Sequence, residues 1–134
     1  MELKEPEVFC KNILVATNDI DELKHFNNVT YLRWVQDLAQ KHWLARATPD
    51  LLKYKWVALN HFIEYKRSAF LGDTIIGKTF IGKMEGVRCD RIAEFYKNDQ
   101  IIVKARSQWC MVEASTLKPI RIHPEMYKLF MKKE

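Results

Sequence analysis

The sequence predicts a single α+β domain in which an antiparallel sheet of about five strands packs on one long helix. A helical pattern of apolar residues runs over one long stretch, and nearly everything after it has the composition of strands. The length of 134 residues fits one core, so we take residues 1–134 as one domain. Strands that follow one another after a single helix favour an antiparallel sheet with the helix on one face.

The elements of the first half follow in order. Residues 8–17 have the β-branched and aromatic content of a strand, and residues 18–26 are polar, as expected of a loop. From residue 27 on, apolar side chains recur at helical spacing, which predicts one buried stripe made of Tyr31, Trp34, Val35, Leu38, Ala39 and His42. Thr48-Pro49 ends this helix or begins a short second one.

The second half is expected to be strands. They cover residues 56–66, 74–83, 88–96 and 101–112, with turns at 71–73, 85–86 and 97–100. In the first of these strands, alternation places one set of side chains on one face, namely Val57, Leu59, His61, Ile63 and Tyr65. The other face then carries Trp56, Ala58 and Asn60. Residues 124–133 predict a short terminal helix with proline in its first turn.

Composition and charge exclude several classes of function. No stretch reaches the ~20 apolar residues of a membrane helix, and the first residues lack the apolar core of a signal peptide, so we expect a cytoplasmic protein without a membrane partner. The formal net charge is +5, but the basic residues are scattered, so we expect no nucleic-acid partner. Cys10, Cys89 and Cys110 are expected to be free thiols. No histidine pair has the spacing of a metal site, so no metal is expected.

The predicted sheet also has a consequence for assembly. About five strands over one helix leave sheet edges whose backbone groups need covering. Pairing of an edge with a second copy would cover one of them, so we expect a homodimer or homotetramer.

The segment Asp19-Ile-Asp21-Glu-Leu-Lys-His25-Phe-Asn-Asn28-Val-Thr-Tyr31 resembles the signature of 4-hydroxybenzoyl-CoA thioesterase-like proteins, which have the hotdog fold. A second segment, Tyr65-Lys-Arg-Ser-Ala-Phe-Leu-Gly-Asp73, resembles a turn of the same family. The resemblance implies a hotdog fold, with the sheet wrapped around a central helix, and hydrolysis of acyl-CoA thioesters. The first segment is also similar to acyl-ACP thioesterases, although Leu23 stands where those enzymes have Asn.

The same resemblance implies three catalytic residues. Asp21 matches the catalytic acid and would act as nucleophile or as general base towards water. Asn28 matches the residue whose backbone N–H, at the helix start, polarises the thioester carbonyl. His25 would help to orient Asp21 or water, or would hold the loop. A loop aspartate and an asparagine pair also serve as ordinary turn and capping residues, which is the structural alternative for both positions.

Further residues are candidates for binding the substrate. By analogy with the family, the strand face of Trp56, Ala58 and Asn60 would lie near the acyl pocket of the neighbouring subunit. The phosphates of CoA would need a few cationic side chains, for which the candidates are Lys66, Arg67, Arg88 and Arg91. A solvated strand end is the alternative for these charges.

We therefore expect an acyl-CoA thioesterase that uses no cofactor. Two other functions stay open: a thioesterase that takes its acyl group from carrier protein, and an oligomeric module that binds acyl groups without hydrolysis. The choice of acyl group depends on packing between subunits, which the sequence does not display.

Overall fold

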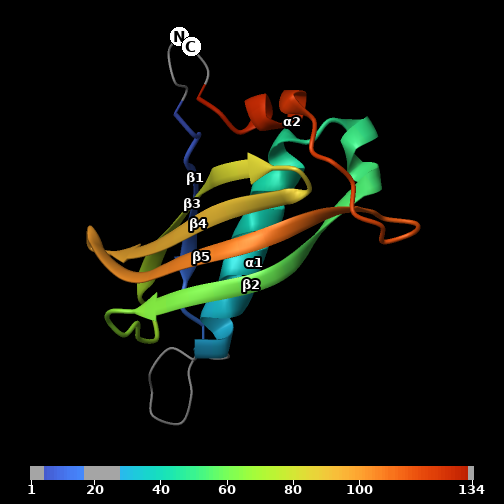
Figure 1. Cartoon of the computed structure of the whole chain (residues 1–134). Helices are drawn as coiled ribbons and strands as arrows, with labels where there is room; N and C mark the ends of the chain where they lie inside the picture. The colour runs from blue at the N-terminus through green and yellow to red at the C-terminus, as the bar shows by residue number, and fades with distance from the viewer. Residues whose placement is uncertain (1–4, 17–27, 133–134) are drawn as a thin grey trace.

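The computed structural model describes residues 5–16 and 28–132, which form the expected α+β layout (Figure 1). Strand β1 (Phe9–Leu14) comes first, followed by the long helix α1 (Asn28–Arg46) and the short 3₁₀ helix η2 (Pro49–Lys53). The remaining elements are β2 (Tyr54–Tyr65), β3 (Thr74–Glu85), β4 (Arg88–Lys97), β5 (Gln100–Glu113) and the helix α2 (Pro124–Leu129). The predicted types and order of these elements are confirmed, and α2 ends earlier than expected.

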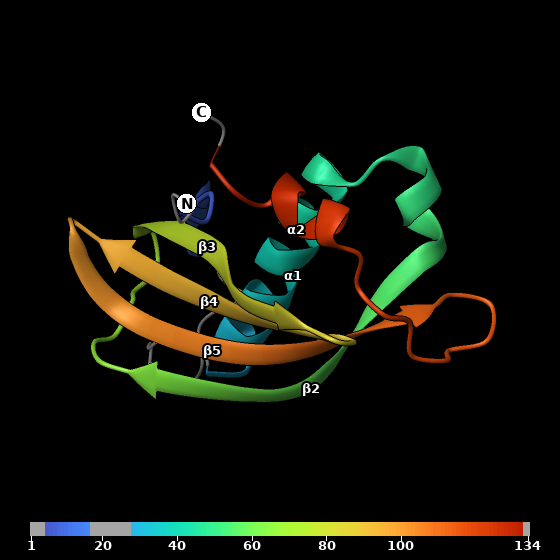
Figure 2. The ribbon, with the colours of Figure 1, turned by 45° about the horizontal axis from the view of Figure 1, so that its top comes forward.

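The five strands form one antiparallel sheet in the order β1-β3-β4-β5-β2, so β1 and β2 are its two edges. Figure 2 shows this sheet curving around α1, with α2 near the end of the helix. The turn between β4 and β5 is tighter than predicted, because only Asn98 and Asp99 lie between the strands. Both have positive φ, at 49° and 64°, and a turn of this kind matches the twist of the flanking strands.

Helix α1 is held against the sheet by the predicted apolar stripe. All six of its residues are buried, together with Thr30 and Trp43. The first half of the helix packs in a core with Phe95 of β4, whose ring contacts those of Tyr31 and Trp34. In the second half, Trp43 packs against Phe130, which lies just after α2. The helix is therefore fixed along its whole length, and its N-terminal end is held in a defined place.

The closest approach of helix and sheet depends on Gly77 in β3. A Cβ atom built there would lie 3.3 Å from side-chain atoms of Ile13, Leu38 and Phe95. Gly82, further along the same strand, is exposed, and its Cβ would meet Asp90 at 3.4 Å. The absence of a side chain at residue 77 thus sets the spacing between the two layers.

We expect Gly77→Val to lower the free energy of unfolding by about 1–3 kcal/mol, because the added methyl groups overfill this contact. Gly82→Val is the matched control, and its effect should stay within about 0.5 kcal/mol because the site is open to solvent. Urea denaturation of both variants measures the difference. Equal losses in the two variants would show that the spacing of the layers does not depend on Gly77.

Candidate functional site

The first candidate region is the N-terminal end of α1, where Asn28 is the first helical residue and is exposed. The first N–H groups of a helix have no partner inside the helix, and the helix dipole favours negative charge beside them. The end of β2 lies next to this point: the hydroxyl of Tyr65 is 3.5 Å from the carbonyl oxygen of Asn28, to which it donates. The backbone N–H of Asn28 therefore has no acceptor inside the helix, and it lies beside an edge strand at the surface.

Aromatic and charged side chains fix the surroundings of this helix start. The rings of Tyr31 and Tyr65 lie 5.7 Å apart. Burial raises the pKa of the Tyr31 hydroxyl, and the neighbouring Tyr65 and Asp73 raise it further, so this hydroxyl stays protonated. Asp73 accepts a hydrogen bond from the backbone N–H of Phe70 and pairs with Lys97 at 2.8 Å. These contacts hold the turn between β2 and β3 in place near the helix start.

Two of the three predicted catalytic residues, Asp21 and His25, lie outside the described residues. Their roles stay predictions. Asn28 is the member of the set that the structure describes, and its backbone occupies the helix start that its predicted role requires.

The predicted strand face of Trp56, Ala58 and Asn60 is corrected by a β-bulge. The register between β2 and β5 shifts between Ala58 and Asn60, because Ala58 pairs with Trp109 while Asn60 pairs with the adjacent Gln108. An extra residue in one strand reverses the side-chain alternation after it. Trp56 and Ala58 therefore share a face, whereas Asn60 lies on the other, where its side chain donates to that of Gln108 at 2.8 Å.

The bulge also divides the other predicted face of this strand. Val57 and Leu59 are exposed, whereas His61 and Ile63 are half-buried against the core side. Strict alternation along the sequence gives no sign of an inserted residue, so only the pairing of β2 with β5 reveals it.

The four basic candidates for CoA phosphates do not lie together. Lys66 and Arg67 follow the end of β2 near the start of α1, are exposed, and bond to Ile102 through their backbone N–H groups. Arg88 is also exposed but lies at the opposite end of the sheet, since it pairs with Cys110 while the end of β2 pairs with Val103. The two ends are about 23 Å apart at a rise of ~3.3 Å per residue.

Arg91 requires a correction, since the sequence grouped it with exposed charges at strand ends. Its side chain is only 7% exposed and points from β4 towards α1. Its Nη1 donates to Nδ1 of His42 at 2.8 Å and lies 3.3 Å from Oγ1 of Thr79. Burial lowers its pKa to about 10, so the guanidinium is still charged at neutral pH. The sequence signal for this burial is its inward position on a strand of buried neighbours.

His42 connects Arg91 to a carboxylate near the N-terminus. Because a guanidinium only donates, Nδ1 of His42 must accept, so the proton lies on Nε2, which donates to Oε1 of Glu7 at 2.9 Å. Glu7 also accepts from Nε of Arg46 at 2.7 Å. Burial, then the charge of Arg91, lowers the pKa of His42 to about 4. His42 is therefore a neutral link between the guanidinium of Arg91 and the carboxylate of Glu7, which also binds Arg46 directly.

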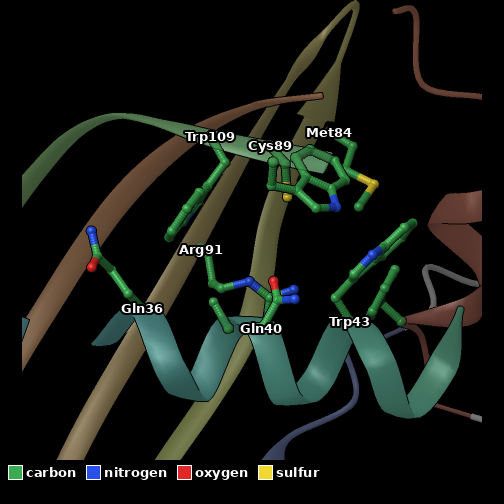
Figure 3. A pocket seen from close by; sticks show the side chains of 10 residues that line it. Gln36, Gln40, Trp43, Met84, Cys89, Arg91 and Trp109 are labelled. Atoms are coloured by element: carbon green, nitrogen blue, oxygen red, sulfur yellow. The ribbon is translucent and has the colours of Figure 1, made fainter. Parts of the chain in front are cut away.

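A small cavity of about 30 Å³ adjoins this cluster (Figure 3). Its walls come from α1, β2, β3, β4 and β5 and from Phe130, and its lining residues are Gln36, Ala39, Gln40, Trp43, Trp56, Met84, Cys89, Arg91, Trp109 and Phe130. Three of these are tryptophans, and Gln36 and Gln40 of α1 line the cavity although both are exposed. The cavity therefore has aromatic walls and one buried positive charge. The predicted substrate face contributes Trp56.

The described residues hold no group of three His, Cys, Asp or Glu side chains that could bind a metal ion. Cys89 lines the cavity, and burial raises the pKa of its thiol to about 11, so it is neutral and neither a nucleophile nor a counter-ion for Arg91. Within the described part of the chain, no helix is long and apolar enough to cross a membrane.

Comparison with known families decides the class of this protein. The model of the thioesterase-like superfamily matches residues 15–130, which is most of the chain. The chain belongs to this superfamily. It is therefore a hotdog-fold thioesterase relative, as the two sequence segments indicated, and membership supports hydrolysis of a thioester. No curated protein sequence matches the chain.

Solved structures of low sequence identity share the fold of this superfamily member. A predicted thioesterase from Bacillus stearothermophilus is 20% identical, with a TM-score of 0.82 over 92% of this chain and 93% of that one. A hypothetical protein from Aquifex aeolicus is 19% identical, with a TM-score of 0.81 over 91% and 98%. A 1,4-dihydroxy-2-naphthoyl-CoA thioesterase from Synechocystis is 12% identical, with a TM-score of 0.78 over 92% and 95%. At these low sequence identities, the similarity shows a shared fold and does not extend to activity or substrate.

Proposed function

We propose that this protein hydrolyses an acyl-CoA thioester to a free acid and CoA, without a cofactor. The single observation that carries the proposal is that α1 begins at Asn28, a residue of the segment that resembles the family signature, where a backbone N–H has no acceptor inside the helix. A structural neighbour from Staphylococcus aureus has been determined in complex with CoA, which agrees with this choice of carrier, although it is only 14% identical.

In the proposed reaction, the thioester oxygen accepts from the backbone N–H of Asn28. A donor at this point stabilises the negative charge that develops as the carbonyl is attacked, and one such donor contributes about 3–4 kcal/mol. Asp21 supplies the attack, either by its own oxygen or by taking a proton from water. The carbon–sulfur bond then breaks, and in the first route water hydrolyses the resulting mixed anhydride, which releases the free acid and regenerates Asp21. The thiolate leaves readily because a thiol has a pKa of only ~8.5.

The exposed Lys66 and Arg67 are the cations best placed for the phosphates of CoA. They follow β2, whose last residue, Tyr65, contacts Asn28, so they lie near the proposed reaction centre. Arg88 lies at the far end of the sheet and does not reach the same nucleotide in one protomer. Charge-assisted contacts to phosphate fix the nucleotide and leave the acyl group directed towards the protein.

The experiment that tests the proposal measures thiol release from a panel of aliphatic and aromatic acyl-CoA substrates in a buffer near neutral pH. Hydrolysis of at least one substrate well above background is expected. The same acyl group on carrier protein gives the comparison, and a faster reaction there would assign the enzyme to acyl-ACP. Tight binding of acyl-CoA without thiol release would show the non-catalytic module instead.

We further propose that the active form is a homodimer, or a homotetramer made of two such dimers, joined through the edge strand β2. This edge has no neighbouring strand among the described residues, although it is twelve residues long. Its exposed apolar side chains are Val57, Leu59, Phe62 and Tyr65. An edge of this kind is prone to pair with another chain, and pairing would bring a second protomer next to Trp56 and Ala58.

Phe62→Lys is expected to convert the oligomer to monomer, because two lysines would face each other across the paired edges and the buried aromatic area would be lost. Phe62 is 66% exposed in the single chain, so the change should leave the fold intact. Light scattering after size exclusion measures the assembly. Leu117→Lys, at an exposed leucine outside β2, is the control and should remain oligomeric. An unchanged assembly in Phe62→Lys would place the interface elsewhere.

A further inference from the structure

The guanidinium of Arg91 is a buried charge without a carboxylate of its own. Within the described residues its hydrogen bonds come from Nη1 alone, to His42 and Thr79, both uncharged acceptors. The guanidinium also lies over the ring of Phe130, 5.7 Å from the ring centroid, and Arg91 lines the cavity together with this ring. A buried ion without a paired charge is costly, and proteins retain one chiefly where another group pairs with it.

The charges around Arg91 do not balance. Glu7 is the one carboxylate in the cluster, and it binds Arg46 directly at 2.7 Å and His42 at 2.9 Å. Arg91 reaches Glu7 only through the neutral imidazole of His42. Cys89, its neighbour in the cavity wall, carries a protonated thiol. Two guanidinium groups thus share one carboxylate, and the excess positive charge lies at the cavity.

The size of the cavity limits what could pair with this charge. A volume of about 30 Å³ holds roughly two water-sized groups, since one water needs about 10–15 Å³. An aromatic ring requires a far larger space, on the order of 150 Å³ in a cavity that binds benzene. A carboxylate has two oxygens and fits the smaller volume. The indole N–H of Trp109, another wall residue, is buried and has no acceptor among the described residues.

The cavity lies along the helix whose start carries the proposed oxyanion donor. Gln36 and Gln40, which line the cavity, are eight and twelve residues beyond Asn28, or about 12 and 18 Å along the helix axis. Arg91 and Gln40 line the same cavity, Arg91 from β4 and Gln40 from α1 (Figure 3). An acyl chain that starts at the helix N-terminus and follows α1 would therefore bring its far end to Arg91.

We propose that Arg91 selects acyl groups that end in a carboxylate, so that the preferred substrate is the monothioester of a medium-length dicarboxylic acid. The bidentate fit of guanidinium to carboxylate supplies the selectivity. The volume of the cavity admits the terminal carboxylate, while the methylene groups that lead to it lie along α1 outside the cavity. Arg91 is thus a specificity-determining residue for the proposed function, on which this inference rests.

The test compares kcat/KM for short, medium and long dicarboxylic monothioesters of CoA with that for the monocarboxylic thioesters of equal length. A preference of about 10- to 100-fold for the medium dicarboxylic substrate is expected, since a hydrogen bond to a charged group has an effect of this size. A medium substrate whose terminal carboxylate is replaced by a carboxamide should lose most of this preference. This substitution alters the substrate only, so the fold of the protein is not at issue.

Arg91→Met supplies the matching change in the protein. The ratio of the dicarboxylic to the monocarboxylic kcat/KM should fall to about one, whereas Arg121→Met, at an exposed arginine outside the cavity, should keep the wild-type ratio. If monocarboxylic thioesters are hydrolysed equally well by the wild type, this inference is wrong while the proposed function stands. If no thioester is hydrolysed, the proposed function itself fails.

Discussion

Asp21→Asn is expected to lower kcat for thioester hydrolysis by at least about 10³-fold, with the folded structure unchanged. The carboxylate is the proposed nucleophile or general base, and an amide of equal size can neither attack the carbonyl efficiently nor take a proton from water. Because Asp21 stands in a stretch of the sequence that predicts a polar loop, loss of its charge should leave thermal unfolding within about a degree or two of the wild type.

Asp19→Asn is the matched control for this variant. The family resemblance assigns the chemistry to the second aspartate of the pair, so the change at the first should retain most of the activity. A kcat above a tenth of the wild-type value in Asp21→Asn would contradict the assignment. A single turnover in heavy-oxygen water then tests the nucleophilic route, because an acid product free of heavy oxygen must have received an oxygen from Asp21.

The buried His42 is expected to make the protein about 2 kcal/mol less stable at pH 5 than at pH 7. Its pKa is about 4 in the folded chain, against an ordinary value of 6.5. The unfolded chain therefore binds a proton as the pH falls below 6.5, while the folded chain does so only near 4. The stability is complete above pH 6.5 and is lost as the pH falls towards 4. Partial burial lowers the pKa of His61 too, which adds a change in the same direction.

Urea denaturation at a series of pH values from 7 down to 5 measures this change, above the range in which carboxylates such as Glu7 titrate. His42→Gln should flatten the profile, because the amide can accept from Arg91 and donate to Glu7 but does not titrate. His123→Gln, at the exposed residue before α2, should leave the profile as it is. A wild-type profile in His42→Gln would assign the pH dependence to another group.

Much of the fold could be predicted from local patterns because each pattern reflects burial of one side of an element. The stripe from Tyr31 to His42 is buried as its spacing predicts, since a helix packed on a sheet must be apolar on one face. In β2, strict alternation of side chains predicted the wrong face for residues beyond the bulge. An extra residue such as Leu59 is visible only when the strand is aligned with its partner β5. The misplacement of Asn60 follows from that single residue.

The candidate site was likewise predictable in part from local sequence and in part only from the packed structure. Local sequence gave the helix start at Asn28, because a polar loop that changes to helical spacing marks a helix N-terminus whatever lies around it. The burial of Arg91 was misjudged because charged residues on strands are usually solvated. Nothing local indicates that His42, which lies 49 positions earlier, would accept from its guanidinium at 2.8 Å.

By itself, the sequence determined the α+β class, the order of the elements and the family to which the chain belongs. These depend on periodicity and on residues close together in the chain. Only the tertiary structure decided that Glu7, His42 and Arg91, from the segment before β1, from α1 and from β4, form one cluster beside a cavity. The pairing of strands and the packing of α1 on them bring these groups together. The same packing buries Arg91, and a buried charge is costly unless another group pairs with it.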